Sequence, residues 1–138
     1  MNIKNFKQMK LSESNLIKPT ESITYDDDFL ANNVDQLIHL LEINKLVVAF
    51  DKVDKTPIGI FTWKDISKIL SSRPWNDILT TWDKVDFVQS EDTVGDCLKK
   101  MSKTGFRAFP VLDNGNLLGV LSSQDIRSNM MNRVKITF

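Results

Sequence analysis

The sequence predicts an α+β fold built from two copies of one small β-α-β-β-α unit, packed together as a pseudo-symmetric pair. The main observation is an internal repeat, because the segment 58–66 (IGIFTWKDI) returns at 118–126 (LGVLSSQDI). Both copies follow the pattern apolar-Gly-apolar-apolar-Ser/Thr-x-x-Asp-Ile. A second observation is the same predicted order of strand, helix, strand, strand and helix in both halves of the chain. A small sheet with helices on one side leaves its other face uncovered, so the two copies are expected to pack together.

Three segments follow from the repeat. They are an N-terminal extension at 1–15, a first repeat at 16–72 and a second repeat at 73–138. The apolar residues of the extension are spaced for a short amphipathic turn of helix, and they are Phe6, Met9 and Leu11.

The first repeat is expected to begin with a strand at 22–25, which has strand composition. The acidic stretch 26–28 is interpreted as a solvated turn that also supplies helix-start charge, and a helix capped by Asn32 or Asn33 is expected to start at Val34. The spacing i, i+3, i+4, i+7 predicts one buried face on this helix, made by Val34, Leu37, Ile38 and Leu41. The remaining elements are a strand at 46–50, a turn at 51–57, a strand at 58–61 and a helix from Thr62.

The second repeat has the same order after a short helix at 75–79. A strand is expected at 85–88, and residues 91–93 form the start of a helix. Its apolar face matches the first helix in spacing and contains Val94, Cys97, Leu98 and Met101. Gly105 is placed where a left-handed residue commonly ends a helix. The remaining elements are a strand at 106–112, an Asn-Gly hairpin turn at 113–116, a return strand at 117–121 and a final helix from Ser122.

The composition is that of a globular protein without a surplus of charge. The 138 residues are 41% hydrophobic, and 18 Lys and Arg residues balance 18 Asp and Glu residues. A zero net charge argues against a nucleic-acid partner, and no apolar run approaches the ~20 residues that cross a bilayer. The single cysteine, Cys97, excludes an internal disulfide and is expected to be a buried structural thiol. No secretory signal is visible, so a cytoplasmic location without a membrane partner is expected.

The repeated motif places a hydroxyl three residues before a carboxylate at two matched positions. These pairs are Thr62 with Asp65 and Ser122 with Asp125. A carboxylate can accept two hydrogen bonds from a ribose diol, and a hydroxyl at a helix start lies beside free backbone N–H groups that suit an anion. The same spacing is close to a capping box, in which the two side chains satisfy backbone N–H groups of the helix start. The residues alone leave both interpretations open.

The order of these motifs resembles the CBS domain, named for cystathionine β-synthase, in its tandem form, the Bateman module. The first copy matches loosely, with 48–51 (VAFD) where the family often has Pro-Val-Val-Asp. The second copy matches more closely, at Thr93 through Met101, Gly105-Phe106, Phe109-Pro110-Val111-Leu112-Asp113, Gly119-Val120 and Asp125-Ile126. The resemblance covers residues 16–131, and the duplicated order of its fragments is more specific than any one fragment.

The resemblance implies a ligand and a site. Many tandem CBS modules bind adenine nucleotides in clefts between their two copies, with AMP, ADP, ATP or S-adenosylmethionine as ligand. In the family pattern, the hydroxyl of Gly-x-x-Ser/Thr-x-x-Asp contacts phosphate and the carboxylate holds the ribose hydroxyls. Carried over to this sequence, these roles fall to Thr62, Asp65, Ser122 and Asp125. The stretch 107–110 borders the ligand cleft in the family, so the resemblance adds Arg107, Phe109 and Pro110.

The leading hypothesis is therefore a stand-alone regulatory module that senses an adenine nucleotide or S-adenosylmethionine. Family modules often pair into flat dimers through their helices, which implies a homodimer, while the regulated protein is left unidentified. No catalytic set is visible, whether a Cys/His pair, a Ser-His-Asp arrangement or a phosphate loop, so no enzyme, metal or firmly bound cofactor is expected. The alternative is a ligand-free scaffold whose function is oligomerisation or docking on a partner protein.

Overall fold

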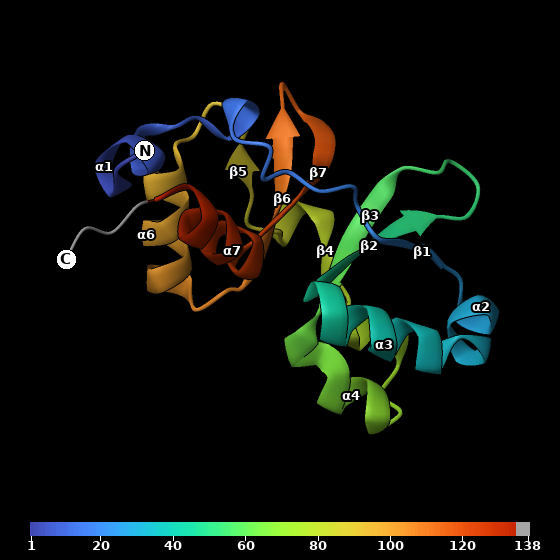
Figure 1. Ribbon diagram of the computed structural model, residues 1–138. Coiled ribbons are helices and arrows are strands. Elements are labelled where there is room, and N and C mark those ends of the chain that lie inside the picture. Colours follow the sequence, from blue (N-terminus) through green and yellow to red (C-terminus); the bar gives the residue numbers. More distant parts are fainter. Residues whose placement is uncertain (135–138) are drawn as a thin grey trace. The chain divides into compact units, whose positions relative to one another are not determined.

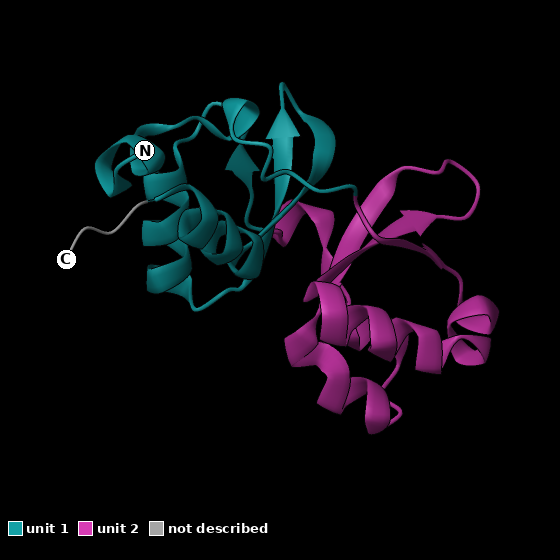
Figure 2. Ribbon diagram, in the orientation of Figure 1, with its two compact units in different colours: residues 1–19, 86–138 teal, residues 20–85 magenta. Residues whose placement is uncertain are grey.

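The chain folds into two compact units, each with a small β-sheet and its own helices (Figure 1 and Figure 2). The computed structural model describes residues 1–134. Unit 1 contains residues 1–19 and the chain from residue 86 onward, and unit 2 contains residues 20–85. The α+β fold predicted from the sequence is confirmed.

Unit 2 holds a four-stranded sheet in the order β1-β2-β3-β4, in which β1 is parallel to β2 and the other neighbours are antiparallel. Its strands are β1 (Ser22–Tyr25), β2 (Leu46–Asp51), β3 (Pro57–Thr62) and β4 (Thr80–Thr81). Its α-helices are α2 (Asp27–Asn32), α3 (Val34–Asn44), α4 (Ile66–Leu70) and α5 (Trp75–Ile78), and its short 3₁₀ helices are η2 (Trp63–Asp65) and η3 (Trp82–Lys84).

Unit 1 holds a three-stranded sheet in the order β5-β6-β7, with β5 parallel to β6 and β6 antiparallel to β7. Its strands are β5 (Val88–Gln89), β6 (Ala108–Asp113) and β7 (Asn116–Ser122). Its helices are α1 (Ile3–Gln8), the 3₁₀ helix η1 (Leu11–Glu13), α6 (Val94–Thr104) and α7 (Ser123–Arg133). Two predictions are confirmed. Gly105 ends α6 in the left-handed conformation, at φ 74°. The predicted hairpin turn between β6 and β7 contains Asn114 and Gly115, with φ values of 49° and 82°.

The β2–β3 and β6–β7 hairpins share the position of one glycine and of one register shift. Gly59 pairs with Ala49 in unit 2, Gly119 pairs with Val111 in unit 1, and the register shifts directly after both pairs. A Cβ on Gly59 would lie 2.3 Å from the carbonyl oxygen of Thr80. A Cβ on Gly119 would lie 2.2 Å from the carbonyl oxygen of Lys18. Each unit therefore needs glycine at this point, because another backbone segment crosses the return strand there.

Each unit has its own hydrophobic core, formed where one face of the sheet meets the helices. In both units the predicted helix face supplies core residues, with Leu37 and Leu41 on α3 and Val94, Cys97 and Met101 on α6. In unit 2, Phe61 of β3 meets Trp75 of α5 edge to face, with ring centroids 6.0 Å apart. The cores contain Ile23, Leu30, Leu37, Leu41, Val47, Ala49, Phe61, Ile69 and Ile78 in unit 2, and Phe6, Leu11, Leu16, Val88, Val94, Cys97, Met101, Phe109, Val111, Leu121 and Ile126 in unit 1.

Several predicted boundaries are wrong. The strand expected at 85–88 is reduced to Val88–Gln89, because the chain before it forms the 3₁₀ turn η3 and then extends without a partner strand. The strand expected at 106–112 begins only at Ala108. Two elements were not predicted: α2, which Asp26 caps through a hydrogen bond from the N–H of Phe29, and β4. Strand β4 depends on pairing with β3, about twenty residues earlier, which periodicity does not report, whereas α2 starts at a local cap within the acidic stretch interpreted as a turn.

The N-terminal segment 1–19 is an integral part of unit 1. Helix α1 packs against α6 and α7 (Figure 1), and Phe6, Leu11 and Leu16 are fully buried in the unit 1 core. Lys18 exchanges two backbone hydrogen bonds with Val120, at 3.0 and 2.9 Å, and so extends the sheet beyond β7. The compact units therefore group residues differently from the sequence repeats, and the repeat segments 16–72 and 73–138 remain a prediction about duplication.

Candidate functional site

The hydroxyl–carboxylate pair of unit 2 lies where β3 passes into η2 and is used to close the helix start. The backbone N–H of Thr62 donates to Oδ2 of Asp65 at 2.8 Å, and the Thr62 hydroxyl donates to the same oxygen at 3.4 Å. The second oxygen, Oδ1, lies 3.8 Å from the Lys68 ammonium. Asp65 is only 6% exposed, and burial raises its pKa although the Thr62 hydrogen bonds and Lys68 oppose that shift. Both carboxylate oxygens thus already have partners within the unit.

The corresponding pair of unit 1 lies where β7 passes into α7 and has a different arrangement. The Ser122 hydroxyl donates to Oδ2 of Asp125 at 2.9 Å and accepts from the Asp125 backbone N–H at 3.1 Å. Asp125 is half-buried, and within residues 1–134 its second oxygen, Oδ1, accepts no hydrogen bond. This carboxylate therefore keeps an oxygen for an external donor, which the Asp65 carboxylate does not.

A third Ser/Thr-x-x-Asp sequence occurs at the start of α6. There the Asp96 N–H donates to the Thr93 hydroxyl at 3.1 Å, and the Thr93 N–H donates to Asp96 Oδ2 at 3.4 Å. These two contacts make a complete capping box. Spacing alone therefore does not define a ligand site in this chain, and the exposure of the carboxylate is what separates the three pairs.

The backbone of Arg107 lies directly beside the unit 1 pair. Its carbonyl oxygen accepts a hydrogen bond from the N–H of Ser123, the first residue of α7, at 2.8 Å. In unit 2 the carbonyl of Lys45 accepts from the N–H of Trp63 in the same way, at 3.1 Å. Both copies therefore place a basic residue immediately before the first hairpin strand and next to the motif. The sequence hides this match, because unit 1 has two extra residues between the end of α6 and β6.

The side chains of Phe109 and Pro110 are buried in the hairpin. Phe109 is 1% exposed and packs edge to face on Phe106, with ring centroids 5.8 Å apart. Pro110 is the next residue of β6 and therefore faces the other side of the sheet. Their buried positions fix the strand that follows Arg107, while their predicted part in a ligand site remains a prediction.

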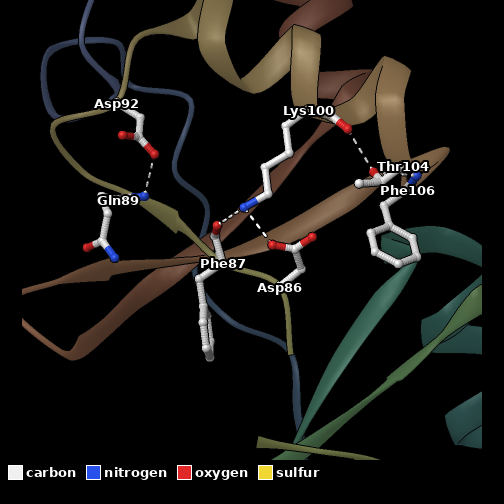
Figure 3. Close-up of polar contacts among 7 residues, drawn as sticks. All are labelled: Asp86, Phe87, Gln89, Asp92, Lys100, Thr104 and Phe106. Atoms are coloured by element: carbon white, nitrogen blue, oxygen red, sulfur yellow. Dashed lines mark hydrogen bonds and ion pairs between the residues drawn. The ribbon is translucent and has the colours of Figure 1, made fainter. Parts of the chain in front are cut away.

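Sequence reasoning missed Lys100, whose ammonium group has two polar partners in unit 1 (Figure 3). Its ammonium group reaches from α6 to donate to the carbonyl of Phe87 and to pair with Oδ1 of Asp86 at 2.6 Å. The same nitrogen lies 5.3 Å from the centroid of the Phe109 ring. Lys100 thus connects α6 to Asp86 and Phe87, the first residues of the chain segment 86–134 in unit 1. Only its place one turn after the buried Cys97 could have suggested an inward-reaching lysine.

Three other expectations concern chemistry outside these pairs. Cys97 is buried as predicted, and burial raises the pKa of its thiol to about 12, so the reactive thiolate is disfavoured. Among the described residues, no cluster of His, Cys, Asp and Glu side chains could hold a metal ion. Within the same part of the chain, every helix is too short or too polar to cross a bilayer.

Comparison with known sequences identifies the second half of the chain. Residues 75–132 match the family model of the CBS domain. The uncharacterized protein MJ0188 of Methanocaldococcus jannaschii is 44% identical over 43 residues, which is 31% of this chain. The match spans 16% of the length of that protein.

Comparison with solved structures covers both halves. The CBS domain pair of protein MJ0100, solved in complex with 5'-methylthioadenosine and S-adenosyl-L-methionine, is similar with a TM-score of 0.68 and 22% identity, covering 91% of this chain and 98% of that one. CBSX2, solved in complex with AMP, is similar with a TM-score of 0.61 and 18% identity, covering 89% and 96%. Residues 75–132 therefore match the CBS domain in sequence, and the chain as a whole has the fold of solved CBS domain pairs.

Proposed function

We propose that the chain is a regulatory CBS-pair module that binds an adenine ligand, AMP, ADP, ATP or S-adenosylmethionine, through the Ser122–Asp125 pair of unit 1. Two proteins of the same fold were solved with such ligands, MJ0100 with S-adenosyl-L-methionine and CBSX2 with AMP. The ligand would act as a signal, and no catalytic step is assigned to the module. The regulated partner would be another protein that responds to the liganded state.

The observation that carries the proposal is the free oxygen of Asp125. A half-buried carboxylate whose Oδ1 accepts no hydrogen bond within residues 1–134 is suited to accept a hydrogen bond from a ribose hydroxyl. Ser122 caps the eleven-residue helix α7, whose positive dipole end favours a phosphate, although the Ser123 and Asp125 N–H groups are already bonded to the Arg107 carbonyl and the Ser122 hydroxyl. The backbone of Arg107 lies at the same helix start, and we propose that its side chain supplies a positive charge to the phosphate.

The Thr62–Asp65 pair is the less favourable site. Its carboxylate is almost fully buried, both of its oxygens have partners, and its pKa is raised by burial. A ligand there would have to displace the Thr62 hydrogen bonds that start η2. We therefore expect one strong site for each chain, in unit 1.

The binding test uses calorimetric titration with AMP and S-adenosylmethionine. Asp125→Asn removes the charge of the assigned ribose acceptor and should weaken binding by about tenfold or more, since charge-assisted hydrogen bonds are worth about 1.5–3 kcal/mol. The matched control is Asp92→Asn in the same unit, because the Asp92 carboxylate likewise accepts a hydrogen bond from a residue three positions earlier, here the Gln89 N–H at 2.8 Å, but has no assigned ligand. Equal affinity in the two variants would remove Asp125 from the site.

The alternative function is a ligand-free scaffold, and one observation favours it. The Thr93–Asp96 pair forms a complete capping box, so the same spacing caps a helix elsewhere in this chain. If none of AMP, ADP, ATP and S-adenosylmethionine binds the wild-type protein, the scaffold becomes the leading function.

We also propose that the module is a cytoplasmic homodimer. Ile43 at the end of α3 is 57% exposed and Leu70 at the end of α4 is 68% exposed, although these two helices contact each other. Exposed aliphatic residues on adjacent helices support burial in a subunit interface. Sedimentation velocity should give the mass of a dimer, and Leu70→Glu should shift it toward the monomer, whereas a wild-type monomer at all concentrations would refute this assembly.

A further inference from the structure

Unit 1 has a groove on a part of its surface that the Ser122–Asp125 proposal does not use. The groove lies between α1 and α6, which pack side by side (Figure 1), and it has a volume of about 440 Å³. That volume is in the range of small-molecule sites, about 300–1,000 Å³. Its lining residues are Ile3, Lys4, Lys7, Gln8, Thr93, Gly95, Asp96 and Lys99.

The two helices lie close together at the groove because α6 has a glycine there. A Cβ on Gly95 would be 3.1 Å from the carbonyl oxygen of Lys7 and 3.3 Å from the Lys7 Cβ. A larger residue would therefore push α1 away from α6. The backbone of α1 is also held in place just after the helix, where the Met9 carbonyl accepts the Val94 N–H at 2.9 Å. The groove is thus bounded by fixed backbone on both sides.

The charge in the groove is strongly unbalanced. Lys4, Lys7 and Lys99 line it, and none of them forms an ion pair with any carboxylate within residues 1–134. The one carboxylate in the groove, Asp96, accepts the backbone N–H of Thr93. The chain as a whole carries no net charge, so three lysines without an ion pair along one groove are a local excess of positive charge.

We propose that this groove binds a small phosphorylated organic anion. Lysine ammonium groups bind phosphate as point charges, and three lysine residues line this groove. The aliphatic stems of the lysines and the half-exposed side chain of Ile3 supply an apolar wall for the organic part of the ligand. The volume exceeds what a bare phosphate ion fills. This site is independent of the adenine-ligand proposal, because it shares no residue with it.

The test is an amide NMR titration of the full-length protein with phenyl phosphate, inorganic phosphate and phenol. Phenyl phosphate should produce saturable shifts at the amides of residues 4–8 and 93–96. Inorganic phosphate should bind there more weakly, and phenol should not bind. Because the lysines are exposed, raising the salt concentration should weaken binding of phenyl phosphate. Absence of saturable shifts at these amides, or equal binding of phenol, would overturn the proposal.

Two charge-matched triple variants separate a site from the effect of net charge. The groove variant is Lys4→Gln, Lys7→Gln and Lys99→Gln, and it should bind phenyl phosphate about tenfold more weakly or worse. The control variant is Lys55→Gln, Lys84→Gln and Lys103→Gln, which lies outside the groove and should stay within about twofold of wild type. Equal losses in both variants would refute the site.

A single substitution keeps the test valid if the triple groove variant does not fold. Lys99→Gln alone leaves α1 untouched and should weaken phenyl phosphate binding by about threefold, since one exposed ion pair is worth up to about 1 kcal/mol. The failure of this site is distinguishable from failure of the adenine site, because Asp125→Asn should leave phenyl phosphate binding unchanged.

Discussion

Replacing Lys100 with methionine should destabilise unit 1 by removing a single ammonium group. Methionine keeps most of the aliphatic stem but removes the ammonium group. The change eliminates the hydrogen bond to the Phe87 carbonyl and the 2.6 Å ion pair with Asp86 (Figure 3). It also eliminates the contact with the Phe109 ring at 5.3 Å. No apolar packing of comparable size is lost.

The expected cost follows from these three contacts. A hydrogen bond to a charged group contributes about 1.5–3 kcal/mol, a surface ion pair about 0.2–1 kcal/mol and an exposed cation–π contact about 0.5–1 kcal/mol. The Lys100 side chain is 31% exposed and that of Asp86 is 42% exposed, so solvent screens the pair and the lower ends of these ranges apply. Lys100→Met should therefore lower the free energy of unfolding by about 2 kcal/mol.

The assay is urea unfolding followed by two signals. All three tryptophans, Trp63, Trp75 and Trp82, lie in unit 2, so tryptophan fluorescence reports on unit 2 while far-UV circular dichroism reports on both units. The control is Lys103→Met, one turn further along α6, where the side chain is exposed and a change below about 0.5 kcal/mol is expected. Equal unfolding free energies for the two variants would refute the role assigned to Lys100.

Three further predictions concern other features of the two units. The pKa of Asp65 is raised by burial, so the folded state holds this proton more tightly than the unfolded state; the stability it contributes is present at low pH and is lost as pH rises through the folded pKa. Asp65→Asn should reduce the change of unfolding free energy with pH between about pH 3 and about pH 7. The prediction would be contradicted if the urea midpoints of variant and wild type changed in parallel over this range. Gly119→Ala should lower the free energy of unfolding by about 2 kcal/mol or more, because the added Cβ would overlap the Lys18 carbonyl. The control Gly115→Ala has open space and a φ of 82°, and should lower it by about 1 kcal/mol. Similar unfolding free energies for the two variants would argue against close contact between Gly119 and the Lys18 backbone. Cys97 should react with a thiol reagent only as the protein unfolds, because its thiol is buried with a pKa of about 12, and rapid labelling of folded protein would disprove this.

The sequence predicted the parts of the fold that depend on local pattern. The faces of α3 and α6, the hairpin turn at Asn114-Gly115 and both motif-bearing helix starts follow from periodicity and turn chemistry, and they are confirmed. What it did not predict depends on distant contacts. The packing of the N-terminal segment on α6 and the two-residue strand β4 are set by partners far along the chain.

The candidate site was only partly predictable for the same reason. The hydroxyl–carboxylate pairs are visible as a repeat, but the difference in burial between Asp65 and Asp125 arises from packing and hydrogen bonding around each pair. The placement of Lys45 and Arg107 beside the motifs follows from strand register, which two extra residues after α6 obscure in the sequence.

The contribution of residues 1–19 to unit 1 constrains the order in which the chain can fold. Unit 2 is continuous in sequence, so all of its contacts are available once residue 85 has left the ribosome. The buried side chains of Phe6, Leu11 and Leu16 belong to a core whose other half is synthesised later, from residue 86 onward. During synthesis these apolar residues therefore have no native partners until unit 2 is complete, and unit 1 forms by closing a loop that contains the whole of unit 2.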